Sequence, residues 1–120
     1  MDQQEHQQLI SEIKYYQELL EQVERSLDNL ARTKKAILEF DEEPSKDFLA
    51  PIANGVYVEA ELKSKKLLVN IGSDVVSSKS VAETISVLEN QEKEVLLDKE
   101  KVIKKIESCY SLLEENNKGV

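Results

Sequence analysis

The 120-residue sequence has no tryptophan, one cysteine, two prolines and three glycines. A single cysteine, Cys109, excludes a disulfide within the chain, and a reducing compartment is its simplest setting. Two phenylalanines and four tyrosines leave little aromatic material for a compact core, whereas Glu and Lys are abundant. This composition favours long helices over a densely packed mixed domain.

From the sequence we also expect no segment that directs the chain to a membrane. No apolar run approaches the ~20 residues that a membrane-spanning helix needs, and the polar start is unlike a signal peptide. We therefore expect a soluble, cytoplasmic protein that contacts no membrane. The net charge of −8, from 24 acidic and 16 basic side chains, argues against a nucleic-acid partner. The excess negative charge is either a solvated helix surface or a means of steering partners.

The first third of the chain shows a heptad pattern. Its seam residues follow one another in steps of four and three, which is typical of a coiled coil. The seam positions are Leu9, Ile13, Tyr16, Leu20, Val23, Leu27, Leu30, Lys34 and Ile37. We expect this helix to cover residues 1–43 and to end at Pro44, which lacks an N–H and disfavours helix in the residue before it.

A second heptad pattern occupies the last third of the chain. We expect its helix over residues 80–116, with Ser80 as the N-cap and Glu83 as the capping-box partner. The seam positions are Ile85, Leu88, Glu92, Val95, Lys99, Val102, Ile106, Cys109 and Leu113. Because the arms are nearly equal in length, we expect an antiparallel coiled-coil hairpin within one chain, in which the polar seam residues control register.

Between the arms, residues 44–79 have the pattern of β-strands. Apolar and polar side chains alternate over residues 56–62, which predicts a half-buried strand, and Leu67, Val69 and Ile71 share a face on the returning strand. The other strands and the turns are expected at 48–52, 53–55, 72–74 and 75–79. The predicted fold class is therefore α+β: a long antiparallel coiled-coil hairpin with two central β-hairpins.

Two hairpins of this size are at best marginally stable alone, and their edges would stay unpaired. We therefore expect the strands to pair with strands of other chains, so that the hairpins form an oligomerisation head. The residues expected in this assembly surface are Pro51, Ile52, Val56, Val58, Val69, Ile71, Val75 and Val76.

The middle segment resembles the α-class subunits of the prefoldin family. The family pattern V-P-I-G-x-G-x-Y-V is similar to APIANGVYV at 50–58, and the pattern V-x-I-G-x-G-V-V-V-x-K is similar to VNIGSDVVSSK at 69–79. On this resemblance, residues 1–120 form one prefoldin-like domain. Ala53 and Asp74 stand where the family often has glycine. Because Ala tolerates left-handed backbone poorly, the first turn is expected to have a different shape.

The resemblance implies a chaperone that uses neither ATP nor a cofactor. Prefoldin-like subunits assemble as hexamers of two α-class and four β-class chains, whose hairpins join into a β-barrel platform. Unfolded client proteins are held at the tips of the coiled coils and are passed to a group II chaperonin. The resemblance places an α-class chain, with its two hairpins, at the centre of the platform.

Apolar residues at the free end of the predicted coil are candidates for client binding. One two-helix seam cannot cover all of them, so some are expected to stay exposed and to capture apolar client segments. The alternative is that they only close the end of the coil. These tip residues are Leu9, Ile10, Ile13, Tyr110, Leu112 and Leu113.

No catalytic or metal-binding motif is present in the sequence, and we expect no enzyme. The single histidine, His6, lies in a polar segment, and Cys109 occupies a seam position where it acts as a small hydrophobe. The alternative to a chaperone is a structural scaffold, such as a filament or adaptor subunit. A scaffold need not suppress the aggregation of a client.

Overall fold

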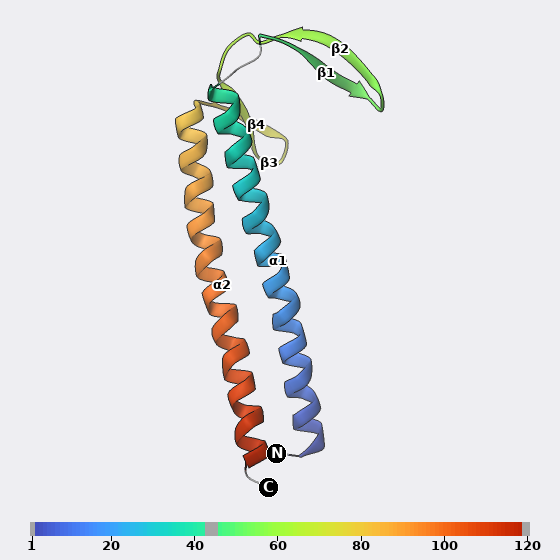
Figure 1. The fold of residues 1–120 in the computed structure, drawn as a ribbon, viewed down its shortest axis with the longest axis vertical. Helices are drawn as coiled ribbons and strands as arrows, with labels where there is room; N and C mark the ends of the chain where they lie inside the picture. The colour runs from blue at the N-terminus through green and yellow to red at the C-terminus, as the bar shows by residue number, and fades with distance from the viewer. Residues whose placement is uncertain (1, 43–45, 119–120) are drawn as a thin grey trace. The chain divides into compact units, whose positions relative to one another are not determined.

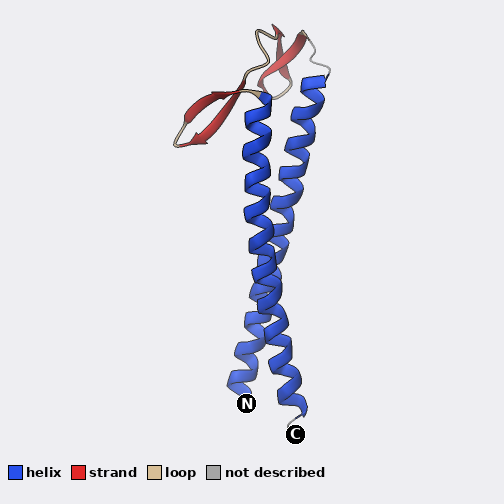
Figure 2. Cartoon of the chain, turned by 90° about the vertical axis from the view of Figure 1, so that its left-hand side faces the viewer, coloured by secondary structure: helices blue, strands red, loops and turns tan. Residues whose placement is uncertain are grey.

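The computed structural model describes residues 2–42 and 46–118, which form two long helices separated in sequence by two β-hairpins (Figures 1 and 2). The elements are α1 (Gln3–Glu42), β1 (Asp47–Ala53), β2 (Val56–Glu61), β3 (Leu67–Gly72), β4 (Val75–Lys79) and α2 (Val81–Lys118). The α+β fold class predicted from the sequence is confirmed. Helix α2 continues past its expected end at residue 116. The expected helix stop at Pro44 lies outside the described residues.

Internal contacts divide the chain into two compact units. The first comprises Met1–Leu30 and Gln91–Val120, and in it α1 and α2 run antiparallel and side by side (Figures 1 and 2). The second, Ala31–Asn90, holds the end of α1, both hairpins and the start of α2. The apolar cluster of the coil and the hairpins therefore belong to different units.

The heptad seam is the packed face of both helices. Every predicted seam position on α1 and α2 is buried or half-buried. The best-packed cluster in the first unit consists of Leu9, Ile13 and Cys109, with Tyr16 and Leu113 packed against it. Isolated helices gain little from propensity alone, so burial of this seam is what stabilises the coil.

Both helices begin at a side-chain cap. The Glu83 N–H donates a hydrogen bond to Ser80 Oγ at 3.1 Å, which confirms the N-cap predicted for α2. The buried Thr84 donates from its N–H and from its hydroxyl to the Ser80 carbonyl oxygen, at 3.0 and 2.8 Å. At α1, the Glu5 N–H donates to Asp2 Oδ1 at 2.7 Å, a cap that we did not predict.

The hairpins are two separate antiparallel pairs. Among the described strands, β1 pairs only with β2 and β3 only with β4. Each register shifts by one residue shortly before the turn, at Ile52 in β1 and at Ile71 in β3. A shift of this kind is a β-bulge, which increases the local twist and leaves an extra residue without a pairing partner in the ladder. Ile52 in β1 and Ile71 in β3 are therefore the extra residues, and neither has a partner on the facing strand.

The two turns differ in backbone conformation, and the different shape expected for the first turn relative to the family stays a prediction. In the first turn the positive φ falls on Gly55, at 75°. In the second turn Ser73 and Asp74 have φ values of 49° and 61°, and they are the non-glycine residues with positive φ in the described part of the chain. Positive φ at both central residues is the conformation of a type I′ hairpin turn. The second turn thus holds this conformation without a glycine or an asparagine at its two central positions.

Candidate assembly and client-binding surfaces

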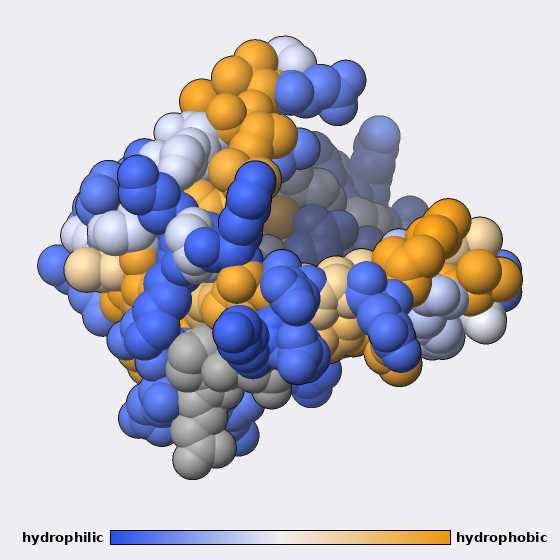
Figure 3. All heavy atoms as spheres, turned by 90° about the horizontal axis from the view of Figure 1, so that it is seen from above, coloured by the Kyte–Doolittle hydropathy of each residue, from blue (hydrophilic) through white to orange (hydrophobic). Residues whose placement is uncertain are grey.

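The hairpins present most of their apolar side chains to solvent. Of the eight predicted assembly residues, Val69 is half-buried and the other seven are exposed. The bulged isoleucines are among the most exposed, at 65% for Ile52 and 60% for Ile71. Four further exposed apolar residues on the strands were not predicted: Phe48, Leu49, Tyr57 and Leu68. Seen from above, apolar atoms cover much of the β1–β2 hairpin, at the right in Figure 3.

An apolar surface of this kind on a single chain marks an interaction site, because soluble monomers rarely leave large contiguous apolar patches uncovered. The side chains lie on short two-stranded sheets, and such sheets have little stability of their own. Exposure and strand pairing therefore agree that the hairpins are suited to assembly.

The second hairpin turns one face toward helix α1. Leu67, at the start of β3, is half-buried and lines a hollow of about 400 Å3. The rest of the hollow is lined by Arg32, Thr33, Ala36, Ile37 and Phe40 of α1. The next residue, Leu68, is exposed, as expected from the alternation of side chains along a strand. One face of β3 is therefore partly covered within the chain, and the other remains open.

The structure divides the predicted tip residues into two groups. Leu9 and Ile13 are buried, at 6% and 7% exposure, and Leu113 packs against them. Ile10 and Leu112 are exposed, at 49% and 48%. The buried group closes the coil, whereas the exposed group is available to a ligand. Burial therefore divides the predicted set in two, and client binding by its exposed members stays a prediction.

Tyr110 also belongs to the exposed group of tip residues. Its hydroxyl oxygen accepts a hydrogen bond from Gln17 Nε2 at 3.1 Å, which joins α2 to α1 at the side of the seam. Tyr15 is exposed as well and makes an edge-to-face contact with Tyr16, with ring centroids 5.3 Å apart. Tyr15 was not predicted, because it lies one position outside the heptad seam.

A second exposed apolar site lies on α2. Leu96 and Leu97 are exposed and line a hollow of about 640 Å3 together with the half-buried Ile103. The charged side chains of Lys93, Lys99 and Glu100 also line it. The site was not among the predicted residues, because its apolar positions fall outside the α2 seam.

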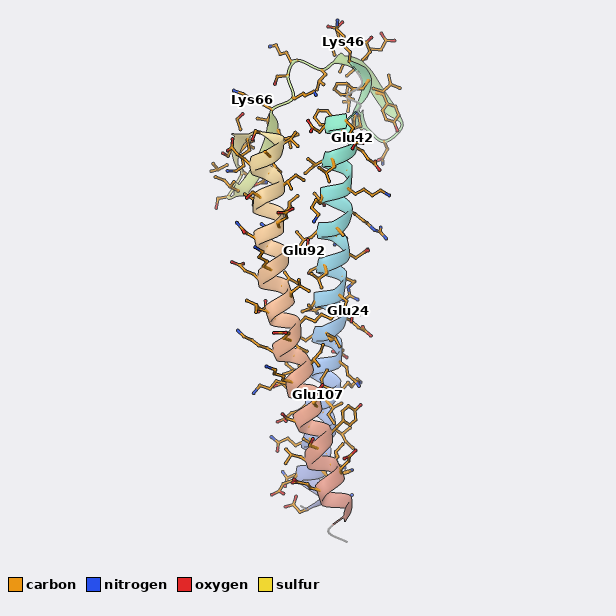
Figure 4. All side chains as sticks on the ribbon, turned by 60° about the vertical axis from the view of Figure 1, so that its left-hand side comes forward. Glu24, Glu42, Lys46, Lys66, Glu92 and Glu107 are labelled. Atoms are coloured by element: carbon orange, nitrogen blue, oxygen red, sulfur yellow. The ribbon has the colours of Figure 1, made fainter. Side chains whose placement is uncertain are left out.

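The coil has a polar position within its seam. Lys99 is half-buried, and its Nζ lies 3.9 Å from Glu24 Oε1 on the facing helix. Acidic side chains such as Glu24 and Glu107 project from the helices of this unit (Figure 4). The contact of Lys99 with Glu24 is consistent with register control, because a polar residue in a seam pairs best in one alignment.

The described residues offer no site for metal chemistry. Within 2–42 and 46–118, no group of three or more His, Cys, Asp or Glu side chains could hold a metal ion. In the same residues, no helix is long and apolar enough to cross a membrane. The hairpins, the exposed tip residues and the hollow on α2 carry exposed apolar side chains, and exposed apolar surface of this kind suits binding to another polypeptide.

A helical hairpin in which two β-hairpins separate the arms defines a class of coiled-coil proteins with strand-bearing heads. The chain belongs to the prefoldin family: residues 3–116 match the family model described as Prefoldin subunit. It is therefore a prefoldin chaperone subunit, which agrees with the expectation that it is not an enzyme.

The relatives point to the α class of this family. The chain is 32% identical over 95 residues to Prefoldin subunit alpha of Methanosphaera stadtmanae, with 73% of this chain and 69% of the relative covered. It is 32% identical over 116 residues to Prefoldin subunit alpha of Archaeoglobus fulgidus, with 89% and 85% covered. The resemblance predicted from the hairpin motifs is confirmed.

A solved structure shows the same fold. The cryo-EM structure of filamentous PFD from Methanocaldococcus jannaschii is similar with a TM-score of 0.80 and 16% sequence identity, and the match covers 99% of this chain and 100% of that chain. At this identity the likeness concerns the fold alone.

Proposed function

We propose that the chain is an α-class subunit of a cytoplasmic hexamer of two α and four β chains. The complex holds unfolded proteins without ATP and passes them to a group II chaperonin, and residues 1–120 act in it as one prefoldin-like domain. Membership of the family supports a chaperone role. The observation that carries the proposal is the exposure of Ile10, Tyr110 and Leu112 beside a seam that is already closed.

Client binding in this proposal uses apolar surface that the folded coil does not need. Ile10 and Leu112 are about half exposed, so replacing them removes little packing energy. Each tip would bind a client weakly, and several tips in one complex would act together through a high effective concentration. The affinity for a client is therefore expected to depend on the number of intact tips.

The test is suppression of client aggregation by the complete hexamer. The double variant Ile10→Ser with Leu112→Ser should lose most of its protection, measured by light scattering of a diluted, unfolded client. Leu38→Ser is the matched control, since Leu38 is a similarly exposed apolar residue of α1, at 45%, outside the tip set. Full protection by the double variant, with unchanged assembly mass, would show that clients bind elsewhere.

Assembly in this proposal uses the hairpins. Val58 is exposed and Val69 half-buried, and both belong to the predicted assembly surface. The double variant Val58→Lys with Val69→Lys should abolish the hexamer while the arms stay helical. Ser78→Lys, which adds the same charge at an exposed polar position of β4, serves as the control. An unchanged sedimentation mass for the double variant would contradict hairpin-driven assembly.

The second candidate function is a structural scaffold. It is favoured by one observation, the match to a protein whose structure is described as filamentous PFD. A scaffold would assemble through the same strands but would not protect a client. Electron microscopy of the chain alone, together with the light-scattering assay, distinguishes the two. Filaments without protection favour the scaffold, and protection by a hexamer favours the chaperone.

A further inference from the structure

The turn of the first hairpin consists of Asn54 and Gly55, which join β1 to β2 and are both exposed. Gly55 has a positive φ of 75°, and Asn54 has a negative φ. Negative φ followed by positive φ is the pattern of a type II turn. In a hairpin a type II turn splays the strands, whereas the type I′ conformation of the second turn follows their twist. The first turn therefore fits its two strands less closely than the second.

The peptide group between Asn54 and Gly55 is not held by other parts of the hairpin. Among the hydrogen bonds of the described residues, none involves the Asn54 side chain or the Gly55 N–H. A Cβ added to Gly55 would meet no atom within 4 Å, so no neighbouring group obstructs rotation of this peptide. Glycine also resists rotation least, because it has no side chain. The Gly55 nitrogen can therefore approach the side chain of Asn54.

Asparagine followed by glycine has a characteristic reactivity in water. The Gly55 nitrogen, once solvent has removed its proton, attacks the side-chain carbonyl carbon Cγ of Asn54. The bond from Cγ to Nδ2 then breaks, Nδ2 takes up a proton and leaves as ammonia, and a five-membered succinimide ring remains. Water opens this ring in two ways, because attack on Cγ gives aspartate and attack on the main-chain carbonyl carbon gives isoaspartate. Water is the co-reactant, and no electrons are exchanged with an oxidant or reductant.

We propose that Asn54 is a site of spontaneous modification, at which the chain converts its own turn to aspartate and isoaspartate. The reaction needs a residue without a Cβ after the asparagine, space for the peptide group to rotate, and contact with water. Gly55 meets the first need, and the open, exposed turn meets the others. The modification needs no enzyme or cofactor, so it proceeds with time in any chain whose first turn is exposed to water.

Other asparagines of the chain are better protected. Asn29 and Asn90 lie inside α1 and α2, where rotation of the peptide group would break helical hydrogen bonds. In the second hairpin, Asn70 Oδ1 accepts a hydrogen bond from the Gly72 N–H at 2.9 Å, which holds the side chain in place. Asn70 is also followed by Ile71, whose branched side chain crowds the nitrogen that would attack. Asn70 is therefore a reference site within the same protein.

Both products change the end of the first hairpin. Each puts a carboxylate in place of a neutral amide, and isoaspartate also adds a methylene to the main chain. The turn is flanked by the exposed side chains of Ile52 and Val56, which belong to the predicted assembly surface. A charge beside apolar side chains opposes their burial, because the charge must then give up water. A modified chain should therefore assemble less well than a fresh one, and this consequence, unlike the reaction itself, rests on the proposed function.

The reaction is tested on the purified full chain, kept for days in warm, mildly alkaline buffer. Peptide mass spectrometry, with fragmentation that separates aspartate from isoaspartate, follows the loss of each amide. Asn54 should lose its amide about tenfold faster than Asn70 and should give both products. Gly55→Asn should slow the loss at Asn54 about tenfold, because asparagine tolerates the positive φ of the turn but adds a Cβ beside the attacking nitrogen. Equal rates at Asn54 and Asn70, or an unchanged rate in Gly55→Asn, would overturn the site.

The effect on assembly is tested by a second comparison. Asn54→Gln keeps a neutral amide, but its longer side chain cannot close the five-membered ring. After identical ageing, each chain is mixed with its β-class partner, and native mass spectrometry measures the complex. The chain with Asn54 should form about threefold less complex than Asn54→Gln, since burying the new charge is unfavourable. Equal amounts of complex from the two aged chains would overturn the effect on assembly. Assembly of the fresh chain tests the proposed function separately, because it involves no modified residue.

Discussion

The Nζ of Lys65 lies 3.3 Å from the backbone carbonyl oxygen of Asp41 and 3.9 Å from its Oδ1. Lys65 belongs to the linker between β2 and β3, and Asp41 to the last turn of α1, which contains no basic residue. A cation at this place satisfies a terminal carbonyl group and opposes the negative end of the helix dipole. The linker therefore supplies the positive charge that the last turn of α1 does not have.

Replacing Lys65 by Ala should lower the free energy of unfolding by about 0.5 kcal/mol, since the contact is largely exposed and screened by solvent. Lys65→Glu should lower the free energy of unfolding further, because it places a second negative charge beside the Asp41 carboxylate. Urea unfolding followed by circular dichroism measures both changes. Lys63→Ala, in the same linker, should have no effect, and an equal loss there would mean that the linker acts through its net charge alone.

The second turn should be stabilised by the residues that its conformation favours. Ser73 and Asp74 both hold a positive φ, so Ser73→Asn with Asp74→Gly should raise the free energy of unfolding of the hairpin by roughly 1 kcal/mol. Amide hydrogen exchange of β3 and β4 in the assembled complex is a suitable measurement. Gly55→Ala should act in the opposite direction, because its φ is 75° although no atom lies within 4 Å of the added Cβ. Slower exchange in both variants would contradict the conformational argument.

The two groups of tip residues should differ sharply in their contribution to stability. Ile13→Ala removes a buried side chain from the cluster with Leu9 and Cys109, and should cost about 2–4 kcal/mol. Ile10→Ala, on the exposed side, should cost less than about 0.5 kcal/mol. Thermal unfolding of the two variants at equal concentration gives the comparison. Similar losses would show that Ile10 is packed in solution.

The contact of Lys99 with Glu24 should fix the alignment of the coil at some expense of stability. Lys99→Leu should raise the free energy of unfolding by about 1 kcal/mol, because an apolar residue enters the seam, and should also loosen the register. Spin labels at Ser26 and Lys101 should report one narrow distance on the order of 10–20 Å, given a helix spacing of ~10 Å. In Lys99→Leu the distribution should broaden. A distance that vanishes on dilution with unlabelled chain would point to coils between chains.

The helices were predictable because their signal is repeated. The α1 and α2 seams recur over many turns, so an error at one position does not move the helix, and even the polar position Lys99 is half-buried as its heptad place requires. The bulges at Ile52 and Ile71 were not predictable in the same way. A bulge depends on how two strands align, and alternation along one strand contains no information about its partner.

The sequence predicted which parts of the chain have exposed apolar residues, but it did not predict every one of those residues. The heptad positions of Leu9 and Ile13 predict their burial, and Ile10 falls beside them on the open side. Contacts made by long side chains from other elements, such as that of Lys65 with Asp41, depend on where the linker lies in space. Tyr15 and Leu97 were missed because an exposed apolar residue outside a pattern leaves no periodic signal.

The separation of the two sheets has a consequence for how such chains diversify. Among the described strands, neither sheet shares a strand with the other, and each has its own turn and its own bulge at the same place before that turn. A recombination event that removes or copies one hairpin therefore leaves the hydrogen-bond register of the other intact. In the proposed assembly, where each hairpin binds its own neighbour, one genetic step would thus change how many neighbours a chain binds, while the remaining ladder needs no adjustment.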